Sequence, residues 1–171
     1  MKISKETMDI LKNFAAINMS ILIREGKRIK TITPQKNVMA IATVEEEFPR
    51  EFAIYDLNQF LGTASLFADA EFDFGEKSVT ISSGSSKAKY MYAAKEAIVF
   101  APEKDITMPQ IEADFKMEEK ALSSALKAAS VMGLPHVTLT GRDGKAFLTA
   151  TDSGNDSTHQ WEQEVGETAS V

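Results

Sequence analysis

The ten residues AIYDLNQFLG at positions 53–62 indicate a strand that leads directly into a helix. The segment 52–55 is short and largely apolar, and Asp56 behind it is a residue type favoured at the N-cap of a helix. The helix is predicted to extend to about Phe67, with apolar residues at helical spacing at Leu57, Phe60, Leu61 and Ala64. Three candidate strands follow at 71–74, 78–82 and 87–93. The local order is therefore one strand, one helix and three strands.

The same order of elements is predicted on both sides of this stretch. Towards the N-terminus we expect a helix from Ser4 to about Ile17, strands at 19–24, 28–33 and 38–44, and an opening strand in the few residues before Ser4. The acidic run at 45–47 is expected to be a solvated loop. Towards the C-terminus the pattern predicts a strand at 111–117, a helix at 118–132 and strands at 136–140, 146–151 and 158–165. The side-chain patterns of the three units match only loosely, so the repeat is one of structure.

Composition limits the class of protein. The 171 residues include 19 Lys and Arg against 25 Asp and Glu, and the net charge of −6 argues against a protein that coats nucleic acid with its whole surface. The chain has no cysteine, which excludes a disulfide scaffold, a zinc ribbon and a thiolate nucleophile within it. Residues 1–44 carry eight Lys and Arg against three Asp and Glu. The first part of the chain is thus basic, and the remainder is strongly acidic.

Two stretches resemble one known family. The segment MKISKETMDILKNFAAIN at residues 1–18 and the strand-to-helix junction at 53–62 are similar to the sliding clamps of T-even-like bacteriophages, the processivity factors of phage DNA polymerase. The resemblance implies an α+β fold of the DNA-clamp type, with antiparallel sheets outside and helices facing a pore. It also implies a non-catalytic homotrimeric ring that encircles double-stranded DNA in the cytoplasm of the infected bacterial host.

The resemblance gives the three units a domain organisation. Because clamp domains are each built from two strand–helix–three-strand units, residues 1–100 are expected to form a first clamp domain and 111–171 the first half of a second. Residues 101–110 contain two prolines and three charged residues and are the expected interdomain connector. A fourth unit would begin where this chain stops, so we expect the chain to be truncated at its C-terminus.

Lysines on two helices are the candidate DNA-binding residues. At 100° per residue, Lys5 and Lys12 lie within about 20° of each other, and Lys120 and Lys127 repeat this spacing. The opposite faces are expected to be apolar, through Ile10, Leu11, Phe14 and Ile17 in the first helix and Leu122, Ala125, Leu126 and Ala129 in the third. A clamp needs such lysines because it must attract phosphates without reading bases. Lysine opposite an apolar face also occurs on any surface helix, and this alternative stays open.

The resemblance also implies surfaces for subunits and protein partners. Family topology would pair the strand at 87–93 with the strand at 158–165 of the next subunit, with apolar anchors at Tyr90, Tyr92 and Trp161. Ordinary positions in a sheet are the alternative for these three aromatics. In the connector, Ile106, Met108 and Pro109 are candidates for binding the apolar tails of phage DNA polymerase and clamp loader, or else they cover the core.

Catalytic and metal-binding chemistry finds little support in the sequence. His136 and His159 are isolated, and the acidic segment 152–156 does not have its glycine and distal glutamate at the spacing of an EF-hand calcium loop. We therefore predict no catalytic residue, metal ligand or cofactor. The alternative to a clamp is a β-rich structural or peptide-binding phage module without DNA contact.

Overall fold

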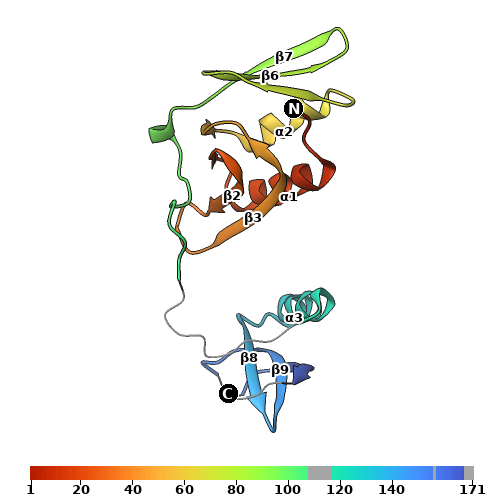
Figure 1. Ribbon diagram of the computed structural model, residues 1–171. Coiled ribbons are helices and arrows are strands. Elements are labelled where there is room, and N and C mark those ends of the chain that lie inside the picture. The colour runs from red at the N-terminus through yellow and green to blue at the C-terminus, as the bar shows by residue number, and fades with distance from the viewer. Residues whose placement is uncertain (108–116, 156, 168–171) are drawn as a thin grey trace. The chain divides into compact units, whose positions relative to one another are not determined.

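The computed structural model describes residues 1–107, 117–155 and 157–167 (Figure 1). The chain divides into two compact units, Met1–Asp105 and Ile106–Val171. This division falls within the segment that the sequence marks as a connector. Each unit has hydrophobic clusters of its own, so each can be understood by itself.

Helices and strands follow the predicted order in both units. The first unit contains, in chain order, α1 (Lys5–Ile17), β1 (Ile21–Ile23), β2 (Gly26–Ile32), β3 (Met39–Phe48), β4 (Phe52–Ile54), α2 (Leu57–Ser65), β5 (Glu71–Phe74), β6 (Ser78–Ser83), β7 (Ser86–Met91) and a short 3-10 helix, η1 (Lys95–Ala97). The second contains α3 (Glu119–Met132), β8 (His136–Arg142), β9 (Lys145–Thr151) and β10 (Trp161–Glu167). The strand predicted at 111–117 lies outside the described residues except for Met117.

The two repeats of the first unit exchange their opening strands. β4 opens the second repeat and pairs antiparallel with β1 of the first. Conversely, the N-terminal residues pair with β5 of the second repeat, because Lys2 forms a bridge with Glu71 and the main chains of Met1 and Phe72 exchange hydrogen bonds of 2.7 and 2.8 Å. The residues before α1 thus act as the predicted opening strand. The exchange joins both repeats into one domain.

A shared apolar core lies between the helices and sheets of this unit. α1 and α2 lie side by side (Figure 1) and bury Leu11, Phe14, Leu57, Phe60, Leu61 and Ala64. Aromatic rings fill the remaining space: Phe52 stacks on Tyr92 with ring centroids 5.1 Å apart, and Phe48 lies edge-on to Phe74 at 5.9 Å. The caps predicted at Ser4 and Asp56 are present, since each side chain accepts a hydrogen bond from the first turn of its helix.

The prediction of a solvated loop at 45–47 is wrong. β3 continues through this acidic run to Phe48, and Glu46 reaches the start of α1. Its carboxylate accepts hydrogen bonds from the main-chain N–H of Ser4 and from the hydroxyl of Thr7. A helix start favours an anion because it carries unpaired N–H groups and the positive end of the helix dipole. Burial raises the pKa of Glu46, but these hydrogen bonds outweigh it and leave the pKa below its ordinary value.

The second unit places α3 on a three-stranded antiparallel sheet of order β10-β9-β8. α3 ends at Gly133, which adopts the left-handed conformation with a φ of 65° that glycine reaches without strain. The turn between β8 and β9 is formed by Asp143 and Gly144, both with positive φ. This is the hairpin turn that an Asp-Gly pair predicts.

The buried face of α3 differs from the predicted one. Ala121, Ala125 and Ala129 are buried, whereas Leu122 and Leu126 are 39% and 54% exposed although their spacing predicts them inside. Alanine lets the helix approach the strands closely, so the narrow alanine face makes the contact. Within the described part of this unit no second helix flanks α3, and the adjacent leucine face therefore meets solvent.

Candidate functional site

The lysines of α1 lie on its exposed side. Lys5 and Lys12 are exposed, while Leu11 and Phe14 are buried on the other side of the helix. Lys12 Nζ lies 2.8 Å from Asp9 Oδ1, and this hydrogen bond lowers the pKa of Asp9. An ion pair between two exposed side chains is weak, so Lys12 remains accessible to a phosphate. α1 thus presents two cations, one of them partly neutralised.

The lysines of α3 repeat this arrangement. Lys120 and Lys127 are exposed and line a shallow groove along the helix with Glu119, Ser123 and Ser124. The alanine face that packs on the sheet points away from them. Each unit therefore carries one basic helix face, and the placement of these faces in a DNA pore stays a prediction.

The two strands predicted to pair between subunits both have a free edge. Among the described residues, β7 pairs only with β6 and β10 pairs only with β9. A free edge exposes N–H and C=O groups that a further strand can bind. Trp161 begins β10 and packs, half-buried, beside Ala129 and Ala150 in the core of the second unit.

Tyr90 and Tyr92 face the core of their own unit. The hydroxyl of Tyr90 donates to the carbonyl oxygen of Asp56 at 3.0 Å, and its ring lies edge-on to Phe60. The ring of Tyr92 stacks on Phe52, and its buried hydroxyl has no hydrogen-bond partner among the described residues. Burial raises the pKa of Tyr92 to about 12 and shifts that of Tyr90 in the same direction. Both tyrosines hold the end of β7 on the core.

Two exposed apolar residues beside this edge were missed in the sequence. Tyr55 and Met91 are 58% and 57% exposed and line a hollow next to β7 together with Lys89. The alternation of a strand could have revealed Met91, because it lies between two inward-facing tyrosines and must point the other way. Tyr55 directly follows β4 and has no comparable pattern around it.

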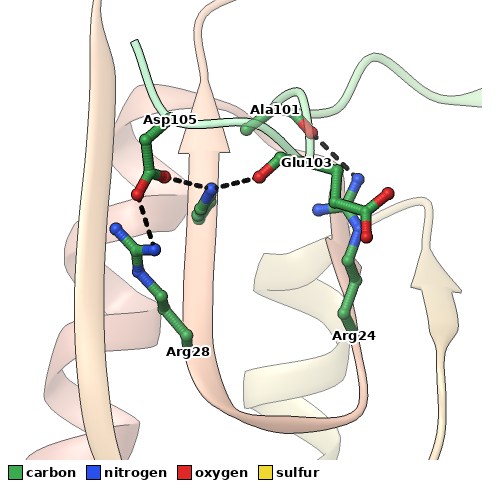
Figure 2. Close-up of polar contacts among 6 residues, drawn as sticks. Arg24, Arg28, Ala101, Glu103 and Asp105 are labelled. Carbon is green, nitrogen blue, oxygen red and sulfur yellow. Dashed lines mark hydrogen bonds and ion pairs between the residues drawn. The ribbon is translucent and has the colours of Figure 1, made fainter. Parts of the chain in front are cut away.

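The first part of the connector is fixed to the first unit (Figure 2). Asp105 lies with Oδ1 2.6 Å from Lys30 Nζ and Oδ2 2.7 Å from Arg28 Nη1. Hydrogen bonds from Lys30 and then Arg28 hold the pKa of Asp105 below its ordinary value. Ile106, the next residue, is 60% exposed. The other two partner-binding candidates, Met108 and Pro109, lie outside the described residues.

The family is decided by two comparisons. The family model of the DNA polymerase processivity factor matches residues 4–100. In an alignment 172 residues long that covers 98% of this chain and 78% of the relative, the chain is 37% identical to the sliding clamp of Vibrio phage KVP40. The chain belongs to this family. The sliding clamps of Escherichia phage RB69 and Enterobacteria phage T4 are 33% and 31% identical, over 92% of this chain and 69% of each relative.

Solved clamp structures share the fold of this sliding clamp. A chain of the PCNA2–PCNA3 complex from Sulfolobus tokodaii matches 95% of this chain and 74% of its own length, with a TM-score of 0.59 and 16% identity. The DNA polymerase III subunit beta from Pseudomonas aeruginosa matches 94% of this chain and 51% of its own length, with a TM-score of 0.55 and 12% identity. The predicted DNA-clamp fold is therefore confirmed.

The function predicted from the sequence is also confirmed at the level of the family: this chain is a phage sliding clamp, a processivity factor in DNA replication. In the part of the chain that the structure describes, no group of three or more His, Asp or Glu residues is placed to hold a metal ion. The described helices are also too short or too polar to cross a membrane.

Proposed function

We propose that this sliding clamp encircles double-stranded DNA as a homotrimeric ring, with α1 and α3 facing the DNA. The observation that supports this best is the repeated basic face, formed by Lys5 and Lys12 in α1 and by Lys120 and Lys127 in α3. Exposed lysines attract phosphates without reading bases, so the duplex can slide past them. The net charge of −6 adds to the argument, because an acidic exterior repels DNA and confines it to the basic interior.

Ring closure in this proposal uses the free edges of β7 and β10. Tyr90 and Tyr92 fix the end of β7 to the core, and Trp161 fixes the start of β10. Tyr55 and Met91 add exposed apolar area next to the β7 edge, of the kind found at the centre of subunit interfaces.

The partners in this proposal are the phage DNA polymerase and the clamp loader. Their apolar tails would bind at the connector residues Ile106, Met108 and Pro109, of which Ile106 is exposed. The clamp itself contributes no catalysis in this scheme. It acts in the cytoplasm of the infected host, where it holds the polymerase on its template.

Charge reversal tests the DNA-facing role. Lys5→Glu with Lys12→Glu, and separately Lys120→Glu with Lys127→Glu, should each abolish most of the stimulation of the phage polymerase on primed circular DNA. Each pair replaces attraction by repulsion along one helix. Assembly measured by sedimentation velocity should not change, because all four side chains are exposed.

The matched control is Lys36→Glu with Lys77→Glu, which makes the same change of charge at exposed lysines outside the helices. This control should retain stimulation. An equal loss in the control, or full stimulation by both helix variants, would contradict the proposal. Retention of the protein on circular but not on linear DNA further separates a clamp from a β-rich module without DNA contact.

A further inference from the structure

Residues 99–105, which we term the strap, are bound to the segment 18–30 mainly through their own main chain. Figure 2 shows the contacts of Ala101, Glu103 and Asp105. Hydrogen bonds reach the strap at every second residue, which is the period of an extended segment. The acceptors are the carbonyl oxygens of Val99, Ala101 and Glu103, and the donors are the side chains of Asn18 and Ser20, of Arg24 and of Lys30, at 2.7 to 3.2 Å. One edge of the strap therefore faces the first unit over its whole length.

Asp105 ends this series and differs from it in kind. Its carboxylate accepts hydrogen bonds from Lys30 and Arg28. The distance from Oδ1 to Lys30 Nζ is 2.6 Å, and that from Oδ2 to Arg28 Nη1 is 2.7 Å. Every residue carries a carbonyl oxygen whatever its side chain, so carbonyl contacts tolerate any sequence. Among the described contacts of the strap, the carboxylate of Asp105 is the one side chain that forms ion pairs, with Lys30 and Arg28 of β2, and these pairs make the docking specific.

Lys30 is placed to receive the strap. Its neighbour Ile29 points into the core, so the alternation of β2 directs Lys30 to the opposite face of the strand, where the strap covers it. Lys30 is 7% exposed, and a buried ammonium without acceptors would strongly destabilise the fold. Glu103 and Asp105 supply two acceptors, which ties the lysine and the strap to each other.

We propose that Lys30 and Asp105 form a latch that fixes the connector to the first unit and thereby positions Ile106 for the apolar tail of a partner. This inference rests on the partner-binding role proposed above for Ile106. Ile106 follows Asp105 directly and is 60% exposed, so an anchored Asp105 limits where its side chain can lie. A partner then meets an ordered apolar side chain and loses less conformational entropy on binding.

Spin labelling tests the latch without any partner. The chain has no cysteine, so Lys104→Cys provides a unique site for a nitroxide label on an exposed residue of the strap. Adding Lys30→Met should markedly narrow the lines of the electron paramagnetic resonance spectrum, which indicates a more mobile label. Methionine keeps about the length of the side chain but cannot donate hydrogen bonds to the strap. Lys27→Met, which removes an exposed lysine of the same strand, is the matched control and should leave the spectrum unchanged.

A second variant, Asp105→Asn, tests the latch in case Lys30→Met disturbs the fold. The side chain of Asp105 is 46% exposed, so Asp105→Asn preserves the fold while it removes the charge that Lys30 and Arg28 bind. In the unlabelled chain, Lys30→Met and Asp105→Asn should both weaken binding of the phage polymerase about tenfold, if a freed connector holds the binding conformation about one tenth of the time. Lys27→Met should bind normally.

The possible results separate the claims. An unchanged spectrum when Lys30→Met, and likewise when Asp105→Asn, is added to the labelled Lys104→Cys chain overturns the latch. A mobile label with unchanged polymerase affinity overturns the positioning role of the latch. Failure of the unsubstituted chain to bind polymerase overturns the proposed partner site, and the positioning role with it, while the spectrum still decides whether the latch exists.

Discussion

At the residue scale, Glu46 shows how one carboxylate completes a distant helix start. In a capping box, the third residue of the helix returns a Glu or Gln side chain to the N–H of the capping residue. Here that third residue is Thr7, and Glu46 of β3 accepts the hydrogen bond from Ser4 in its place. The cap at Ser4 could be predicted from its residue type. Its partner could not, because 42 residues separate the two in the sequence.

Loss of this carboxylate should destabilise the first unit. We expect Glu46→Ala to lower the free energy of unfolding by about 1–2 kcal/mol at neutral pH, whereas Glu45→Ala and Glu47→Ala at the exposed neighbours should change it by less than about 0.5 kcal/mol. The folded-state pKa of Glu46 is lowered, so its contribution is present above the unfolded pKa and disappears as the pH falls through the folded one. Urea denaturation should therefore show the difference at pH 7 and lose it in acid. Equal effects at all three positions would refute the assignment.

Tyr90 and Tyr92 should respond differently to loss of the hydroxyl. Tyr90→Phe removes a hydrogen bond to Asp56 and should cost about 1 kcal/mol. Tyr92→Phe should cost nothing, because its buried hydroxyl has no partner among the described residues. Thermal unfolding of the two variants compares them directly, and equal losses would exclude this explanation.

The raised pKa of Tyr92 also predicts a pH effect. A pKa of about 12, against the ordinary 10.0, means that the folded state keeps a proton that the unfolded state releases. Ionisation of Tyr92 therefore leaves stability unchanged below pH 10, and the free energy of unfolding falls as the pH rises from 10 towards 12. Near-ultraviolet absorbance should show a late phenol titration that Tyr92→Phe abolishes. A late step that survives the substitution would assign it to another tyrosine.

At the scale of elements, the predictable parts are those with both a terminal signal and a periodic interior. α1 and α2 have Ser4 and Asp56 as caps, and α3 has Gly133 as its stop. The extension of β3 was missed because its charged residues are typical of loops when their contacts are unknown. The strap was missed for a different reason, since contacts to carbonyl oxygens leave no trace in the sequence.

The candidate site was predictable to a similar degree. The exposure of the four lysines follows from helical geometry, which needs no knowledge of neighbours. The exposure of Leu122 and Leu126 in α3 does not follow from helical geometry. Periodicity gives the apolar side of a helix but not which part of that side contacts the sheet. Burial is decided by the partner, and here the partner contacts the alanine face.

The alanine face and the leucine face of α3 should therefore differ in how well they tolerate substitution. Ala125→Leu inserts a large side chain where Ala125 is 0% exposed and should destabilise the second unit by about 1–3 kcal/mol. Leu126→Ala shortens a side chain that is 54% exposed and should change stability by less than about 0.5 kcal/mol. Denaturant unfolding followed by the fluorescence of Trp161, the one tryptophan of the chain, reports on this unit. A larger effect at Leu126 would mean that the leucine face is the packed one.

At the scale of the whole molecule, the proposed ring closure uses strand edges that the described part of the fold leaves unpaired. Among the described strands, β7 and β10 each have a single neighbour, and the hollow beside β7 exposes Tyr55 and Met91. Free edges of this kind invite pairing with another chain. Since Met91 is 57% exposed, its side chain can be changed without disturbing the core.

A charge at Met91 should therefore weaken self-association selectively. We expect Met91→Glu to lower the association constant at least about tenfold in sedimentation velocity, because the interface would have to bury an unpaired carboxylate. Leu66→Glu is the matched control, since Leu66 is 78% exposed at the end of α2 and away from β7 in the sequence. If both variants associate as the parent does, the interface lies elsewhere.

The exchange of opening strands has a consequence for synthesis on the ribosome. Met1 and Lys2 leave the exit tunnel about seventy residues before their partners in β5, since the hydrogen bond from Met1 to Phe72 spans a sequence separation of 71. These two residues must therefore wait unpaired while the elements from α1 through β4 to α2 emerge. Neither repeat can close its sheets alone, so the domain forms only after its second half is translated, and the two halves are committed to folding together.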